Sequence, residues 1–195
     1  MIYEIFNDKK EFVNAISADE DFVVNYCKEN NYTFSLRESF ENLDALRMDK
    51  IIEIKEDCER YINNGSDIKF PTGVIKHFTY NLADQSNISE MFTAVMAGAT
   101  EYPYHADGEI CKIYTKEQII TIYGTLSLFK TEATTYHNSL KAQINAMTDA
   151  SAISASKFKE TELTGEYLTN YNEMMTSAQT QLNAILAKIP TDEAV

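Results

Sequence analysis

The first forty residues alternate short apolar runs and polar turns, a pattern typical of a small sheet with one helix. Two β-prone runs within residues 2–18 flank a polar turn at residues 7–10, which predicts a hairpin. Asp19 is a helix-capping residue that precedes apolar side chains at helical spacing, and a third β-prone run covers Tyr32–Leu36. The pattern therefore predicts a compact ββαβ-like head over residues 1–40.

Between this head and residue 115 the spacing of apolar residues changes repeatedly from helical to strand-like. The predicted elements are a helix over residues 43–63, a hairpin with strands at 67–70 and 74–80, a short helix over 88–97, and a hairpin with strands at 101–105 and 109–114. Gly65 supplies the left-handed residue that ends the first helix. Pro71-Thr72-Gly73 and Asp107-Gly108 supply the two hairpin turns.

Two long amphipathic helices account for most of the remaining chain. Thr115 and Gln118 form a capping-box pair, which predicts the start of a helix that continues to about Met147. After a small, polar segment, a second helix covers residues 163–189, and Pro190 ends it. Apolar and aromatic side chains recur at steps of three and four residues on both helices. This predicted assembly seam consists of Ile119, Ile122, Leu126, Phe129, Tyr136, Leu140, Met147, Leu168, Tyr171, Met175, Leu182, Ile185 and Ile189.

Isolated helices are marginal in water, so these seams must be buried against another surface. The two helices can pair as an antiparallel hairpin within one chain, or the same seams can meet across chains in a coiled coil, and the pattern does not choose between these arrangements. The predicted class is α+β, with small β-hairpin and helix modules followed by two long heptad-patterned helices. The expected domains are a head at 1–40, an α+β domain at 41–148, a linker at 149–162, a C-terminal assembly helix at 163–190 and a tail at 191–195.

Charge and composition narrow the classes of partner. Thirty acidic and 17 basic side chains give the 195-residue chain a net charge of −13. Such a chain repels phosphate backbones, and its basic residues are scattered, so no nucleic-acid partner is expected. No apolar run approaches the roughly 18 residues of a membrane span, and the first residues lack a signal-peptide pattern, so we expect cytoplasmic synthesis without membrane insertion. Three widely spaced cysteines, Cys27, Cys58 and Cys111, favour neither a disulfide framework nor a zinc site.

One short segment contains side chains that could bind a metal ion or act in catalysis. His105, Asp107 and Glu109 alternate along an extended stretch, but the turn already explains Asp107, and no further ligands lie nearby. Cys111 could lie across the hairpin from His105, yet the pattern offers neither an oxyanion site nor an orienting third group. A solvated turn is favoured over a metal site, and ordinary sheet packing is favoured over a catalytic Cys–His pair. Because the glycines form no phosphate-binding pattern either, no cofactor, metal or catalytic residue is expected.

Several short motifs carry a resemblance to a known family. They are Cys58-x-x-x-Ile62, Asp67-Ile68-Lys69-Phe70, His77-Phe78-Thr79-Tyr80, Asp84-Gln85-Ser86-Asn87-Ile88, Thr115-Lys116-Glu117-Gln118 and Leu140-Lys141-Ala142-Gln143-Ile144. With these motifs, Ile54 to Asp149 resembles an uncharacterised domain that recurs in proteins encoded among bacteriophage and prophage tail genes. The first thirty residues, especially Val13 to Phe22, are similar to the amino-terminal module of short proteins found beside tail-fibre genes.

The resemblance implies a tail-region protein, and the two seams suit assembly with other protein. We therefore expect a structural or accessory component of a phage tail or tail-like particle, associated with the baseplate or a tail fibre. Its expected partners are other tail or fibre proteins and further copies of itself, and its expected location is the virion, after synthesis in the host bacterial cytoplasm. The alternative is a cytoplasmic chaperone for tail-fibre assembly that is absent from the mature particle. No enzymatic activity is expected.

Overall fold

The computed structural model describes residues 2–36 and 40–189, and within them it shows a mixed α/β chain with small antiparallel sheets and six helices. The elements are β1 (Ile2–Phe6), β2 (Phe12–Ser17), α1 (Glu20–Asn30), β3 (Thr33–Leu36), α2 (Phe40–Asn64), β4 (Ser66–Lys69), β5 (Ile75–Phe78), α3 (Leu82–Met96), β6 (Glu101–Tyr104), β7 (Lys112–Thr115), α4 (Lys116–Ala146), α5 (Ala150–Ala155) and α6 (Gly165–Leu186). The predicted α+β class is confirmed. The predicted helix end at Pro190 and the tail at 191–195 lie outside the described residues.

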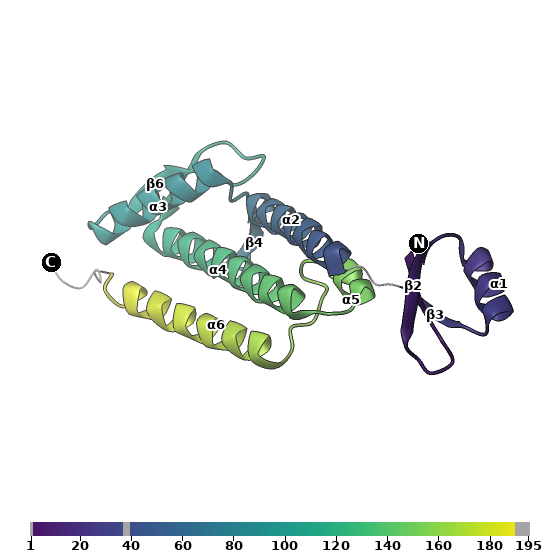
Figure 1. Cartoon of the computed structure of the whole chain (residues 1–195). Helices are drawn as coiled ribbons and strands as arrows, with labels where there is room; N and C mark the ends of the chain where they lie inside the picture. Colours follow the sequence, from purple (N-terminus) through teal and green to yellow (C-terminus); the bar gives the residue numbers. More distant parts are fainter. Residues whose placement is uncertain (1, 37–39, 190–195) are drawn as a thin grey trace. The chain divides into compact units, whose positions relative to one another are not determined.

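The chain divides into two compact units, here called the N-terminal unit (residues 1–46) and the C-terminal unit (residues 47–195). The N-terminal unit contains an antiparallel sheet in the order β2-β1-β3, and α1 covers one face of it (Figure 1). Tyr3 and Ile5 of β1 are buried with side chains of α1. Asp19 holds the predicted N-cap position of α1, although its side chain makes no capping hydrogen bond. The predicted ββαβ order is therefore confirmed.

Aromatic rings hold together the two hairpins of the C-terminal unit. Phe78 of β5 is fully buried, and its ring contacts those of Phe70, Tyr104 and Tyr114 with centroids 6.1 to 6.3 Å apart. The ring of Tyr104 lies parallel to that of Phe78, whereas the other two meet Phe78 at steep angles. Because offset and edge-to-face contacts of this kind stabilise buried rings, each hairpin gives the other an apolar face to pack on.

The β6–β7 hairpin differs from its prediction, because its strands are shorter and residues 105–111 form a long connection. The Asp107-Gly108 turn is present within that connection, closed by a 3.0 Å hydrogen bond from the Glu109 N–H to the Ala106 carbonyl. The Asp107 N–H donates to the His77 carbonyl at 3.0 Å, and the Asp107 carboxylate accepts from the Thr79 N–H at 3.1 Å. The connection at residues 105–111 therefore packs on the neighbouring hairpin. Its own backbone does not pair between β6 and β7.

The short helix α3 begins at Leu82, earlier than the predicted residue 88. Its start is a capping box, in which the Asn81 side chain accepts from the backbone N–H of Asp84 and the Asp84 carboxylate accepts from the Asn81 N–H. The sequence prediction missed this start because the Asn-x-x-Asp pair is a less common version of the Ser/Thr-x-x-Glu/Gln motif.

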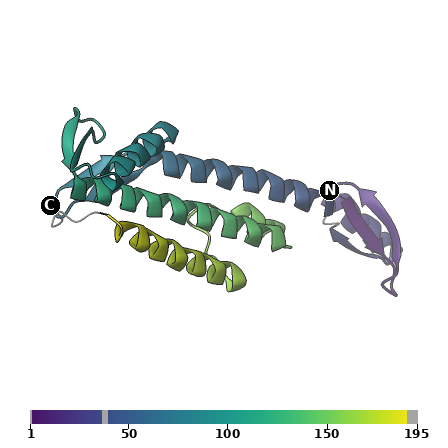
Figure 2. The same ribbon diagram turned by 90° about the vertical axis from the view of Figure 1, so that its left-hand side faces the viewer.

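The long helices follow their predicted starts and stops closely. Thr115 and Gln118 form the expected capping box of α4, and Gly65, with φ of +73°, follows the end of α2. In both views α4 lies between α2 and α6 (Figures 1 and 2). No helix within residues 2–36 and 40–189 combines the length and the apolarity needed to cross a membrane.

The segment at residues 149–162, expected as a linker, is packed against the rest of the C-terminal unit. It contains α5, whose N-cap Asp149 accepts a 2.9 Å hydrogen bond from the Ser151 N–H, and it buries Ile153 and Phe158. The burial of Ile153 and Phe158 was not predicted, because the segment is otherwise small and polar and neither residue belongs to a periodic apolar pattern.

Candidate interaction groove

Helices α4 and α6 form an antiparallel pair within one chain, the first of the two arrangements that the seams allowed. Three contacts along the pair give its register. The Thr164 N–H donates to the Gln143 side chain at 2.9 Å, and the Tyr171 hydroxyl donates to the Glu132 carboxylate at 2.8 Å. Further along, the buried side chain of Leu182 lies beside Gly124, where an added Cβ would be 3.7 Å from it, an ordinary van der Waals contact.

The seam is buried on α4 but only partly on α6. Ile119, Ile122, Leu126, Tyr136 and Leu140 are buried, and Phe129 and Met147 are half-buried. Among the seam residues from Leu168 to Ile189, only Leu182 is buried. Tyr171, Met175 and Ile189 are half-buried, and Leu168 and Ile185 remain 41% and 38% exposed. The burial shown here arises within one chain, so a role of these residues in assembly stays a prediction.

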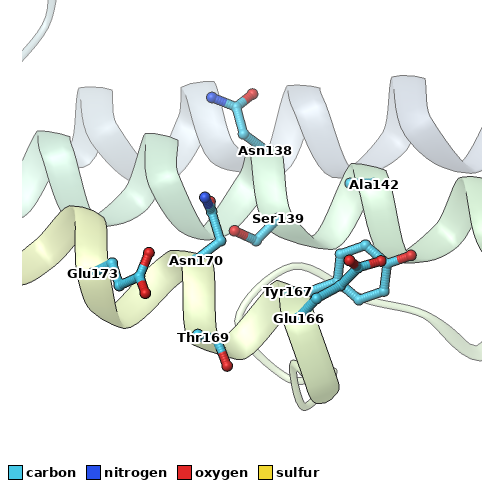
Figure 3. Close-up of a pocket in the computed structure, with 8 residues that line it drawn as sticks. All are labelled: Asn138, Ser139, Ala142, Glu166, Tyr167, Thr169, Asn170 and Glu173. Carbon is cyan, nitrogen blue, oxygen red and sulfur yellow. The ribbon is translucent and has the colours of Figure 1, made fainter.

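A groove runs along one side of the α4–α6 pair. It consists of two hollows of about 580 and 350 Å³ that share Asn138 and Asn170, and it is therefore continuous. Figure 3 shows the side chains of its larger hollow, which come from facing turns of the two helices. The residues lining the whole groove are Thr131, Thr135, Asn138, Ser139 and Ala142 of α4 and Glu166, Tyr167, Thr169, Asn170, Glu173, Met174, Ser177, Ala178 and Gln181 of α6.

The residues that line this groove are mostly of polar types, but the larger part of the surface that they expose is apolar, and their only charges are negative. Glu166 and Glu173 belong to the larger hollow, and no lysine or arginine lines either hollow. These residues were not predicted from the sequence, because the prediction rested on the apolar seams. A signal was available in Thr131, Thr135 and Asn138, which recur at helical spacing beside the α4 seam and are all polar.

A cluster of charged and aromatic side chains connects the segment before α6 to α2 and α4. Lys159 forms an ion pair with Glu132, and its ammonium lies 5.4, 5.0 and 5.8 Å from the ring centroids of Tyr61, Tyr136 and Phe158. We call these five residues the Lys159 cluster. Burial and a hydrogen bond to Glu132 raise the pKa of the adjoining Tyr171 to about 12, so its hydroxyl stays protonated and donates to that carboxylate.

Two hydrogen bonds extend this anchoring along the same segment. The Tyr136 hydroxyl donates to the Thr161 carbonyl at 2.5 Å, and the buried Gln143 amide donates to the Glu162 carbonyl at 3.0 Å. Gln143 lies between the seam residues Leu140 and Met147 at the same spacing of three and four residues, and its partners in the segment before α6 explain a polar side chain there. The start of α6 is thus held by polar contacts, whereas its later turns pack through the half-buried Met175 and the buried Leu182.

The side chains of the His105–Glu109 motif have separate partners. The Asp107 carboxylate accepts from Thr79, and Glu109 pairs with Lys76 at 2.5 Å and with Lys112 at 2.9 Å. The ring of His105 stacks on Tyr104. In the described part of the chain, no group of three or more His, Cys, Asp or Glu residues is arranged to hold a metal ion.

Cysteine accessibility offers a test of this packing. Cys111 is exposed, whereas Cys58 is buried and its thiol lies 3.6 Å from the Ala133 carbonyl. Burial raises the pKa of Cys58 to about 11, which leaves almost no reactive thiolate at neutral pH. We expect iodoacetamide to modify Cys111 in the native protein at least ~100-fold faster than Cys58. Peptide mass spectrometry over a time course measures both rates, and comparable rates would contradict the buried position of Cys58.

His77 and His137 should titrate in opposite directions from the ordinary histidine pKa. Hydrogen bonds from His77 to the Asp67 carboxylate and the Asn64 carbonyl, both 2.7 Å, raise its pKa, and the nearby Asp107 adds to the effect. Burial lowers the pKa of His137. We expect imidazole NMR titrations to place His77 above and His137 below the ordinary value of about 6.5. Protonated His77 therefore stabilises the fold at low pH and loses that contribution as pH rises through its folded-state pKa. The effect of His137 on stability has the opposite pH dependence. Stability falls when pH drops below about 6.5, because the unfolded state then binds a proton that the folded state does not.

Comparison with known proteins places the chain in a family. Residues 45–157, more than half of the chain, match the family described as "Domain of unknown function (DUF4376)". The chain belongs to the DUF4376 family. The matched region runs from α2 through the capping of α3 and α4 to α5 and the segment that follows it, and it contains the α4 side of the groove. No curated protein and no solved structure matches the chain. The family description names no activity or partner, so the tail-protein resemblance stays a prediction.

Proposed function

We propose that this DUF4376 protein is a structural or accessory component of a phage tail or tail-like particle, associated with the baseplate or a tail fibre, that acts by assembly with other protein. One structural observation supports this function above the others. The α4–α6 pair buries the apolar seam of α4 on one side and leaves a long groove open on another. Open surfaces between paired helices are common sites for an additional helix.

The resemblance to proteins of phage tail regions supports the biological setting. On this proposal the partners are tail or fibre proteins and other copies of the chain, and the particle is its location. Exposed apolar side chains on the N-terminal unit, Phe12 and Phe22, give a second surface that a partner would cover. Neither surface requires a cofactor or a catalytic step.

Quantitative mass spectrometry of purified particles tests the proposal. The phage or prophage that encodes the chain is grown, its particles are purified by density gradient, and peptides of this chain are counted against those of the major tail protein. A structural component should be present at a fixed copy number per particle in independent preparations. A chaperone for tail-fibre assembly would be abundant in the infected cytoplasm and missing from the particles, and that outcome would reject the virion location.

A further inference from the structure

The residues around the Lys159 side chain form a cage that holds one ammonium group. The cage consists of Tyr61 of α2, Glu132 and Tyr136 of α4, and Phe158 of the segment before α6, and we call these four residues the ammonium cage. The ring of Phe158 meets those of Tyr61 and Tyr136 at steep angles, with centroids 5.6 and 5.4 Å apart. The Lys159 ammonium lies over all three rings, 5.0 to 5.8 Å from their centroids.

The chemistry of the cage matches a primary ammonium. The faces of aromatic rings attract a cation, and they do so more strongly where the site is partly removed from water. The Glu132 carboxylate supplies the opposite charge and accepts a hydrogen bond from the Lys159 ammonium. The Tyr171 hydroxyl donates to the same carboxylate at 2.8 Å and so helps to position it. A quaternary ammonium has no N–H and could not make the bond to Glu132.

The backbone that presents Lys159 to the cage is held by other contacts. The Thr161 N–H donates to the Lys157 carbonyl at 3.1 Å, and the Lys157 N–H donates to the Thr161 hydroxyl at 2.7 Å. The turn therefore does not need the Lys159 side chain in order to form. Within it Lys159 has φ of +65°, a conformation that is unfavourable for a residue with a Cβ. Its side chain is 26% exposed, so solvent reaches the cage.

We propose that the ammonium cage is a binding site for a primary alkylammonium group, and that Lys159 occupies it as an intramolecular ligand which a second ammonium can replace. The ligand class is given by the group already bound between Glu132 and the three rings. Replacement would relieve the unfavourable backbone conformation of Lys159, which offsets part of the advantage of a tethered ligand. This site is separate from the groove and does not depend on the proposed function.

Lys159→Gly in the full chain, with n-butylammonium chloride as the probe, tests the inference. Glycine adopts a positive φ readily, so the turn is preserved while the cage is emptied. The probe has the same carbon chain and nitrogen as a lysine side chain, and it is protonated at about pH 7. NMR titration of the Tyr61 and Tyr136 ring signals should give a dissociation constant of about 10 mM. At about 100 mM the probe should raise the Tm of this variant by about 4 °C, relative to sodium chloride at the same ionic strength.

Two chains that keep Lys159 are the matched controls. In the wild-type chain the tethered lysine fills the cage, so binding should be at least ~10-fold weaker. Lys157→Gly removes a lysine from the same segment, one whose ion pair with Glu160 is exposed, and leaves the cage filled. In both chains the probe should raise Tm by less than about 1 °C.

Related probes and a second substitution test the ligand class. In Lys159→Gly, butyltrimethylammonium should bind about 5-fold more weakly than n-butylammonium, because it cannot donate to Glu132. The uncharged 1-butanol should not bind. Adding Glu132→Gln should weaken binding of n-butylammonium about 10-fold, since the carboxylate charge is lost. Nα-acetyl-lysine methylamide carries the same ammonium on a peptide unit and should bind as n-butylammonium does, which extends the ligand class from free amines to lysine side chains.

Several results would overturn the inference. They are an equal rise in Tm for the wild-type chain and Lys159→Gly, equal binding of 1-butanol and n-butylammonium, and unchanged tyrosine ring signals at about 100 mM probe. Far-ultraviolet circular dichroism shows whether Lys159→Gly folds. If its spectrum is not native, the probe must restore the native spectrum, and Lys159→Ala, which retains a Cβ, must gain Tm with the probe. Failure of either response would also reject the site.

Discussion

Replacement of Gly65 by alanine is expected to lower the free energy of unfolding of the C-terminal unit by about 3 kcal/mol or more. Gly65 has φ of +73°, a conformation that costs other residues roughly 1–2 kcal/mol. The larger part of the effect is a clash, since an added Cβ would overlap the carbonyl oxygen of Phe78 and lie 2.7 Å from the Cα of Thr79. Both atoms belong to backbone, which has little freedom to move away.

The clash would also separate α2 from the β4–β5 hairpin. The Tyr80 N–H donates to the Asn63 carbonyl at 3.1 Å, and a ring nitrogen of His77 lies 2.7 Å from the Asn64 carbonyl. These two contacts satisfy the last carbonyls of α2, and both depend on the close approach at Gly65.

Gly73→Ala is the matched control for this prediction. Gly73 has φ of +85°, but a Cβ there would meet nothing within 4 Å. It should therefore show only the conformational penalty of about 1 kcal/mol. Urea titrations followed by far-ultraviolet circular dichroism measure both variants. If the two losses agree within ~0.5 kcal/mol, the close approach of the hairpin to α2 is wrong.

Local chemistry explains which elements could be predicted from the sequence. Thr115 with Gln118, and Gly65 after Asn64, are short motifs that act on neighbouring backbone, and both were located correctly. The apolar seam of α4 was also readable, because burial on one face of a helix imposes a period that the residues must follow. These signals depend on residues only a few positions apart.

The pairing of α4 with α6 could not be predicted in the same way. An intramolecular hairpin and an intermolecular coiled coil bury the same seam, so periodicity cannot separate them. What distinguishes them in the structure is the segment before α6. Its Lys159 pairs with Glu132 of α4, and its Glu162 carbonyl accepts a hydrogen bond from Gln143 of α4. The groove was missed for a related reason, since the residues that line it show no apolar period.

Lys159→Met is the second substitution with a large expected effect, a loss of about 2 kcal/mol in the free energy of unfolding of the C-terminal unit. Methionine keeps the length and the apolar stem of lysine but removes the ammonium from three rings and from Glu132. The two side chains are 26% and 27% exposed, so solvent screens their attraction only in part. After the substitution the Glu132 carboxylate keeps the Tyr171 hydroxyl as a partner, which offsets some of its desolvation.

Lys157→Met is the control for Lys159→Met, because Lys157 lies in the same segment and pairs with Glu160 at 3.2 Å while both side chains stay exposed. It should lower the free energy of unfolding by no more than about 0.5 kcal/mol.

Hydrogen exchange shows which helix is affected by Lys159→Met. In Lys159→Met the amides of α6 should lose protection first, since Leu182 is the only buried side chain within that helix. The amides of α2 should keep theirs, because its buried Ile54 and Ile62 do not depend on Lys159. Equal losses in α2 and α6 would mean that α6 unfolds only with the whole unit, and the Lys159 cluster would then stabilise the core without controlling the helix that forms one wall of the groove.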